Sequence, residues 1–175
     1  MITHILNILK IKVFDDFLPN RVCQDLFEKI CEYPFYRTEK DFKGSNKTGL
    51  THDLTHNHDI KNYILQSIKV KNVIDLEKYK IKEFYINLFL PNENPKLHID
   101  SSNKQDITFL LYISPNKYNE NEKGTTDFLF GNFIFGVRYK QNRVITFPST
   151  FLHKANSFLT EDRLSIAIKF EKYHV

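Results

Sequence analysis

The sequence predicts a mainly β domain with flanking helices, built as a double-sheet jelly roll. After residue 80 the chain consists of short runs with a period of two separated by turn residues, whereas two helical periodicities occur before it. Sixteen Phe and nine Tyr against five Gly favour strands with large side chains inside. A length of 175 residues with 41% apolar content supports one core. We therefore expect a single domain over 1–175, with a helical and strand support region over 1–80 and the jelly-roll core over 81–171.

The first 80 residues are expected to form one strand and two helices. Residues 8–14 alternate loosely and predict a strand. An apolar stripe at helical spacing predicts a helix from Pro19 to about Glu32, and a second stripe predicts a helix over 59–68. The intervening residues 35–58 show no periodicity and are expected to be irregular. The residues expected to face inward are Val22, Cys23, Leu26, Phe27, Ile30 and Cys31 on the first helix, and Ile60, Tyr63, Ile64, Leu65 and Ile68 on the second.

The rest of the chain is expected to form eight short strands. Gly131–Asn132 between two Phe-rich runs is a two-residue hairpin signal. Residues 115–124 form a polar loop between two of the strands. The expected strands are 81–90, 96–100, 106–113, 125–130, 133–139, 143–147, 151–156 and 163–171.

Charge, cysteine content and the N-terminal run argue against a nucleic-acid-binding, a disulfide-bonded and a secreted or membrane protein. The net charge is only +4 and the lysines are scattered, which favours a solvated surface over a nucleic-acid patch. Cys23 and Cys31 lie about 12 Å apart on one predicted helix, too far to bridge within it, and are expected to be reduced, buried thiols of a cytoplasmic protein. Lys10 and Lys12 interrupt the apolar N-terminal run, so neither a signal peptide nor a membrane span is expected.

His98 and Asp100 are candidate metal ligands. On an extended strand, residues at i and i+2 point from the same face, so both side chains reach the same place. A second histidine, His153, follows an apolar strand-and-turn run and completes two imidazoles and one carboxylate. This ligand set is typical of non-haem Fe(II) oxygenases.

Arg163 is a candidate for binding an anion. The chain has five Arg against twenty Lys, and this one lies on the small-residue face of a strand, together with Ser165 and Ala167. An unpaired buried guanidinium is costly, so an anionic partner is expected. Its planar fork suits a carboxylate.

With these residues the chain resembles the 2-oxoglutarate- and Fe(II)-dependent dioxygenases, in particular their prolyl-4-hydroxylase-like branch. His98-x-Asp100, His153 and Arg163-x-Ser165 are similar to the family motif. The resemblance extends over nearly the whole chain. It also includes the segments 13–18, 107–113, 124–128 and 142–148.

The resemblance implies a cupin-like double-stranded β-helix that hydroxylates a substrate with release of succinate and CO2. It implies Fe(II) held by His98, Asp100 and His153, 2-oxoglutarate as cosubstrate and O2, and leaves a requirement for ascorbate open. The distal carboxylate of 2-oxoglutarate is expected on Arg163, with help from Ser165, Tyr112 and Thr108.

Substrate and activity leave alternatives open at this point. The loop 91–97 departs from the family pattern, so peptidyl proline, a free amino acid and another small metabolite are all retained, and a nucleic-acid substrate is disfavoured. Two other classes remain: a cupin-type oxygenase that does not use 2-oxoglutarate, and a catalytically silent metal-binding module.

Three further features have two or more interpretations each. His52, His56 and His58 could belong to a solvated loop, to a lid over residues 36–58 that orders when substrate binds, or to a second metal site. Arg143 could bind substrate or cap a strand edge. Asn87 could contact the cosubstrate or substrate, or be an ordinary hydrogen-bonded polar residue.

Overall fold

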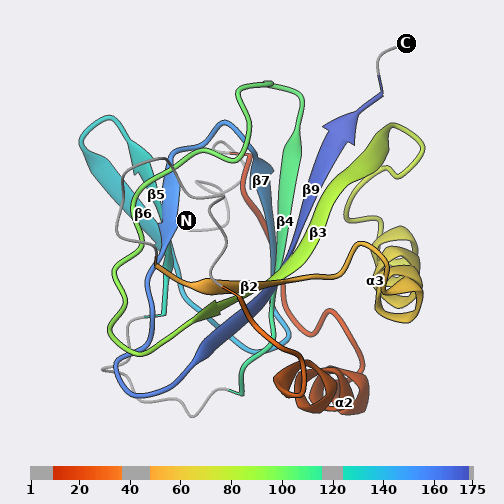
Figure 1. The fold of residues 1–175 in the computed structure, drawn as a ribbon. Helices are drawn as coiled ribbons and strands as arrows, with labels where there is room; N and C mark the ends of the chain where they lie inside the picture. Colours follow the sequence, from red (N-terminus) through yellow and green to blue (C-terminus); the bar gives the residue numbers. More distant parts are fainter. Residues whose placement is uncertain (1–9, 37–47, 116–123, 174–175) are drawn as a thin grey trace.

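The structure is a computed structural model, and it describes residues 10–36, 48–115 and 124–173. These residues form two facing antiparallel β-sheets, with two helices packed on the outer side of the larger sheet (Figure 1). The predicted jelly-roll class is confirmed. The elements are β1 (Lys12–Phe14), α2 (Asn20–Cys31), β2 (Leu50–Asp53), α3 (His58–Val70), β3 (Tyr79–Phe89), β4 (Ile107–Tyr112), β5 (Thr126–Phe130), β6 (Phe133–Val137), β7 (Val144–Pro148), β8 (His153–Ala155) and β9 (Arg163–Lys172).

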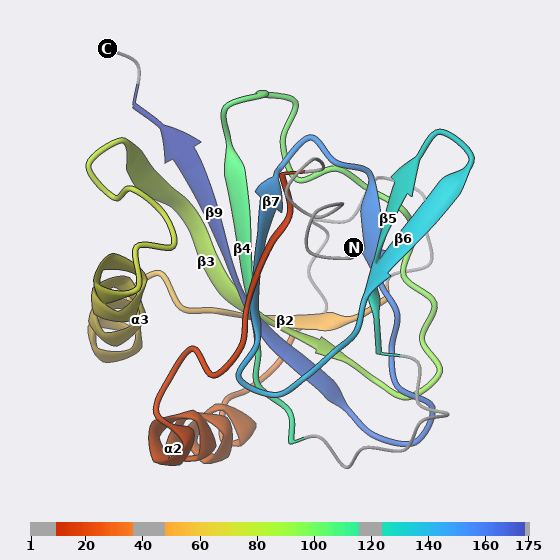
Figure 2. The same ribbon diagram turned by 180° about the vertical axis from the view of Figure 1, so that it is seen from behind.

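The two sheets differ in size. The large sheet has the strand order β1-β7-β4-β9-β3-β2, and the small sheet has the order β6-β5-β8 (Figure 2). The prediction that 35–58 is irregular is wrong at β2, which pairs with β3 at the sheet edge. A four-residue edge strand is specified mainly by its partner, so its own sequence carries little signal. The predicted lid over 36–58 does not form one continuous loop among the described residues, because it contains β2 and ends at His58, the first residue of α3. Its residues 37–47 lie outside the described residues.

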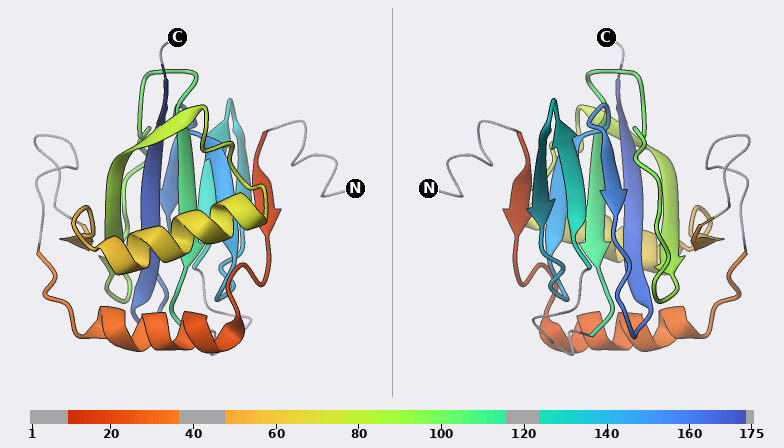
Figure 3. Two further views of the ribbon diagram at one scale, coloured as in Figure 1. Left: turned by 90° about the vertical axis from the view of Figure 1, so that its right-hand side faces the viewer. Right: turned by 90° about the vertical axis from the view of Figure 1, so that its left-hand side faces the viewer.

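Both helices cover the outer face of the large sheet (Figure 3). The side chain of Asn57 caps α3 by accepting a hydrogen bond from the Ile60 N–H at 3.1 Å. Cys23 is buried as predicted, but Cys31 and Tyr63 are exposed, because each lies at the margin of its helix's apolar stripe. Among the described helices, none is long and apolar enough to cross a bilayer. The buried helical residues are Cys23, Leu26, Ile30, Ile60, Ile64 and Ile68.

Alternation along the strands divides the apolar side chains into two clusters. One lies between the helices and the large sheet and includes Leu164 and Ile166 of β9. The other lies between the two sheets and includes Ala167. Because strand residues alternate, Arg163, Ser165 and Lys169 share the face of Ala167. The residues predicted to form a site therefore point into the space between the sheets, which we call the inter-sheet space.

Candidate active site

The two predicted histidine ligands face each other across one backbone bridge. The His98 N–H donates to the His153 carbonyl at 2.9 Å, and the His153 N–H donates to the His98 carbonyl at 2.9 Å. His153 also pairs with Phe128 of β5, so the bridge joins His98 to the small sheet. The strand predicted over 96–100 is reduced to this bridge. The Asp100 N–H donates instead to Ser149, in the turn that precedes β8.

Asp100 places its carboxylate between the two imidazole rings. Its Oδ1 lies 3.7 Å from His98 Nε2, and its Oδ2 lies 3.6 Å from His153 Nε2. One ligand atom from each of the three residues lies within 4.8 Å of the others. One ion can span that spacing, because metal–nitrogen and metal–oxygen bonds in proteins are about 2.0–2.2 Å long. Within residues 10–36, 48–115 and 124–173, no other group of three or more metal-ligating side chains has this spacing.

Each imidazole is held with its Nε2 free. His98 Nδ1 lies 3.1 Å from the Lys96 carbonyl, and His153 Nδ1 lies 2.8 Å from the Phe151 carbonyl. A carbonyl can only accept, so Nδ1 carries the proton in both rings and Nε2 offers its lone pair to a metal. Burial lowers the pKa of His153 to about 4, which keeps the ring neutral.

Hydroxyl groups orient the Asp100 carboxylate. Thr108 donates to Asp100 Oδ2 at 2.6 Å and lies 2.9 Å from the Ser149 hydroxyl. Thr108 was expected beside the distal carboxylate of the cosubstrate, and the structure places its hydroxyl on Asp100. Burial alone raises the pKa of Asp100, but His153, Lys169 and the Thr108 hydroxyl together hold it below its ordinary value.

Strand register arranges the other inner-face residues in rows along β9. Exposure falls from 18% for the Lys169 side chain at one end to 1% for Arg163 at the other. Asp100 lies at the Lys169 end, close to His98, whose side chain is 33% exposed. We therefore call the Lys169 end open and the Arg163 end closed. The rows are Thr108–Lys169–Glu83, Leu110–Ala167–Tyr85, Tyr112–Ser165–Asn87 and Arg163–Phe89.

Arg163 is buried without an anionic partner among the described residues. Its Nη2 donates to Thr126 Oγ1 at 3.0 Å, while its Nε is buried and has no hydrogen-bond partner. The Tyr112 hydroxyl lies 2.6 Å from the same Thr126 oxygen. Three aromatic rings surround the guanidinium, with centroids 5.2 Å (Tyr112), 5.3 Å (Tyr139) and 5.8 Å (Phe89) from Cζ. A buried guanidinium with unfilled donors is suited to binding an anion.

The small sheet sets the distance between this anion pocket and the metal ligands. Thr126 contacts Arg163, and Phe128, two residues along β5, pairs with His153. Two strand residues span about 7 Å. That separation of the two backbone positions is comparable to the length of a five-carbon dicarboxylate.

Several site residues were not predicted from the sequence. Thr126 and Tyr139 line the anion pocket, and Ser149 supports Thr108. Lys169 lies beside Asp100, and the alternation that placed Arg163 on the inner face also places Lys169 there. The sequence signal for Lys169 was therefore present. Tyr139 lies at the end of an expected strand, and its contact with Arg163 depends on tertiary packing that no local pattern indicates.

The remaining candidate residues do not belong to the group formed by His98, Asp100 and His153. Arg143 forms a bidentate pair with Asp15, at 2.6 and 3.0 Å, which favours the structural interpretation. His52 stacks on Tyr33 on the helix side of the sheet, with centroids 4.6 Å apart, and so points away from the inter-sheet space. Asn87 lies on the inner face opposite Ser165.

The fold has well-defined counterparts among solved structures. No family model matches the sequence, and no curated protein matches it. A prolyl hydroxylase from Trichoplax adhaerens, solved with a peptide fragment of hypoxia inducible factor, superposes with a TM-score of 0.74 at 14% identity. The superposition covers 98% of this chain and 88% of that one. The chain has the fold of the prolyl hydroxylases.

Two further structures support this assignment of the fold. A Pseudomonas putida prolyl-4-hydroxylase gives a TM-score of 0.74 at 15% identity, over 96% of this chain and 95% of that one. HygX from Streptomyces hygroscopicus, solved with nickel and 2-oxoglutarate, gives a TM-score of 0.70 at 11% identity. That superposition covers 97% of this chain and 85% of HygX. The double-stranded β-helix expected from the resemblance is therefore confirmed.

Proposed function

We propose that the protein is an Fe(II)- and 2-oxoglutarate-dependent dioxygenase that hydroxylates its substrate and releases succinate and CO2. The observation that carries the proposal is the buried Arg163, which lacks an anionic partner among the described residues and lies across the inter-sheet space from His98, Asp100 and His153. A metal centre alone fits many activities. A metal centre within a dicarboxylate's length of an unfilled guanidinium fits far fewer.

The residues present fit the iron and the cosubstrate. His98 Nε2, His153 Nε2 and one Asp100 oxygen would hold the metal on one side and leave its other side free. When bound, iron and 2-oxoglutarate supply the activation of O2 that a hydroxylation needs, and ascorbate is an additional reductant to be tested. The chain itself fixes the orientation of both imidazoles, through the carbonyls of Lys96 and Phe151.

The closed end of the inter-sheet space binds the distal carboxylate in this proposal. Arg163 offers Nε, which has no partner, and Nη2, which already contacts Thr126. The hydroxyl oxygens of Tyr112 and Thr126 lie 2.6 Å apart, and either hydroxyl can rotate to donate a hydrogen bond to the ligand. Ser165 is buried on the same face and completes the polar lining. The aromatic rings around the guanidinium exclude water, which strengthens a charge-assisted pair.

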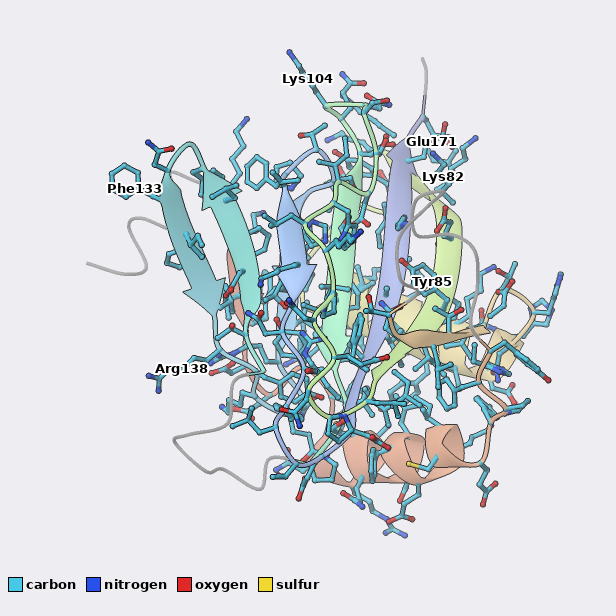
Figure 4. The ribbon with its side chains drawn as sticks, turned by 60° about the vertical axis from the view of Figure 1, so that its left-hand side comes forward. Lys82, Tyr85, Lys104, Phe133, Arg138 and Glu171 are labelled. Atoms are coloured by element: carbon cyan, nitrogen blue, oxygen red, sulfur yellow. The ribbon has the colours of Figure 1, made fainter. Side chains whose placement is uncertain are left out.

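The open end determines the substrate. It is bordered by Glu83, Tyr85 and Lys169 on the large sheet. Figure 4 labels Tyr85. Among the structural counterparts, the Trichoplax protein was solved with a peptide and HygX with hygromycin B. We infer a peptide or small-molecule substrate, and peptidyl proline, a free amino acid and a small metabolite are the candidates to compare.

The test begins with binding and then measures turnover. Titration of 2-oxoglutarate into Mn(II)-loaded protein should show one site, and Fe(II) with O2 should give succinate that increases when a substrate from a peptide and metabolite panel is added. The His98→Ala variant should produce none. Metal binding without 2-oxoglutarate binding would favour a cupin-type oxygenase. Binding of both without succinate formation across the panel would favour a catalytically silent module.

A further inference from the structure

A lysine lies at the metal centre, where the proposed reaction needs no extra cation. Lys169 Nζ is 3.4 Å from Asp100 Oδ1 and 3.1 Å from Glu83 Oε2. Its ammonium also lies 5.5 Å from the centroid of the Tyr85 ring. The side chain is only 18% exposed, so solvent screens these contacts weakly.

The two oxygens of the Asp100 carboxylate have different neighbours. Oδ2 accepts the Thr108 hydroxyl at 2.6 Å, whereas the described residues offer Oδ1 no hydroxyl donor. Oδ1 lies instead between His98 Nε2 at 3.7 Å and Lys169 Nζ at 3.4 Å. Oδ1 is thus the oxygen without a hydroxyl donor among the described residues, and it is the oxygen beside the ammonium. A divalent ion and a lysine cation this close repel each other strongly in a partly buried site.

Glu83 offers the ammonium a second position. It is the cross-strand partner of Lys169, so the lysine can stay with Glu83 without moving the backbone. Glu83 Oε2 is buried and has no aligned hydrogen bond, and Lys169 lies at ion-pair distance from it. Without Glu83, the nearest described carboxylate for the ammonium would be Asp100 itself.

We propose that Lys169 and the metal compete for Oδ1 of Asp100, and that Glu83 holds the Lys169 ammonium away from that oxygen once the metal is bound. The inference rests on the proposed metal site and adds two positioning residues to it. Lys169 acts as the counter-ion of Asp100 in the metal-free protein. Glu83 acts on the metal mainly through Lys169, whose ammonium lies within ion-pair distance of both Glu83 and Asp100.

The experiment is an Mn(II) titration of the full chain without 2-oxoglutarate. Lys169→Met keeps the side-chain length and removes the charge, and should tighten Mn(II) binding by at least about tenfold. Glu83→Gln should weaken it by at least about threefold, because the ammonium then stays on Asp100. The double variant should lie closer to Lys169→Met than to Glu83→Gln, since the direct attraction of the more distant Glu83 for the metal is weaker than its effect through the lysine.

Lys82→Met is the matched control, because it makes the same charge change at an exposed residue away from Tyr85 (Figure 4). It should leave Mn(II) affinity unchanged, and an effect equal to that of Lys169→Met would attribute the change to net charge and overturn the proposal. Weaker or equal binding by Lys169→Met, with an unchanged melting temperature, would also overturn it. Failure of the wild-type chain to bind Mn(II) would contradict the proposed metal site itself, whereas a reversed order among the variants contradicts only the competition.

Discussion

Replacing Arg163 by Met should have opposite effects on stability and on cosubstrate binding. In the ligand-free protein this guanidinium is buried, its Nε is unpaired, and its Nη2 donates a hydrogen bond to Thr126. Burying an unpaired charge costs several kcal/mol, and one hydrogen bond to a charged group returns only about 1.5–3 kcal/mol. The free energy of unfolding of Arg163→Met without ligand is therefore expected to equal or exceed that of the wild type.

Binding of 2-oxoglutarate should weaken in the same variant. A bidentate, charge-assisted pair in a water-excluding pocket is worth about 1.5–3 kcal/mol, which corresponds to about 10- to 150-fold in affinity. The loss should be confined to the distal carboxylate. The variant should therefore bind 2-oxoglutarate no more tightly than 2-oxobutyrate, which lacks that group. The wild type should bind 2-oxoglutarate about 10- to 150-fold more tightly than 2-oxobutyrate.

Calorimetric titration of both 2-oxoacids into Mn(II)-loaded protein, together with denaturant unfolding of the ligand-free protein, measures the two effects. Arg143→Met is the control, because Arg143 is paired with Asp15 outside the site. It should leave both affinities unchanged and lower stability slightly. Marked destabilisation of Arg163→Met with unchanged discrimination between the acids would refute the reasoning and make this arginine a structural residue.

Three further predictions concern the metal and the surface. Asp100→Ala should abolish Mn(II) and Fe(II) binding while the far-ultraviolet circular dichroism stays unchanged, and retained wild-type affinity would contradict the site. Thr108→Val removes the hydroxyl that donates to Asp100 and should weaken Mn(II) binding about 10- to 100-fold. Weaker binding of 2-oxoglutarate with unchanged Mn(II) affinity would instead support the first expectation, that Thr108 contacts the cosubstrate. Arg143 and, more weakly, Lys140 hold the pKa of Asp15 below its ordinary value against the opposing effect of burial. The free energy of unfolding of the wild type should therefore exceed that of Asp15→Asn by about 0.5–1 kcal/mol above pH 5. Urea unfolding should show this difference vanish as the pH falls through the lowered pKa of Asp15. A difference independent of pH would contradict the ion pair.

Much of the fold followed from local periodicity. Alternation along the sequence of β9 was enough to place Arg163 and Ser165 on one face, because that strand is regular from end to end. The helices followed from apolar stripes whose buried residues recur every three or four positions. These features depend on neighbours in the sequence, so the sequence was sufficient to predict them.

The contacts that were missed depend on register between distant strands. The pairing of β3 with β9 shifts between Ile81 and Glu83, and this irregularity places Glu83 opposite Lys169. No local sequence pattern predicts such a register shift, because it depends on the pairing of two strands that are distant in the sequence. Likewise, Thr126 lay within a segment that resembles the family, yet its contact with Arg163 is made across the two sheets and depends on how they pack.

The backbone bridge between His98 and His153 has a mechanical consequence. His98 belongs to the connection between β3 and β4, His153 belongs to the small sheet, and Asp100 is tied to β4 through Thr108. An ion held by all three side chains fastens these parts at one point of the sandwich, beside two short peptide hydrogen bonds that it reinforces. An ion bound there would therefore add a link between the two sheets beside the backbone bridge and the inter-sheet apolar cluster, at the place where we expect a substrate to enter.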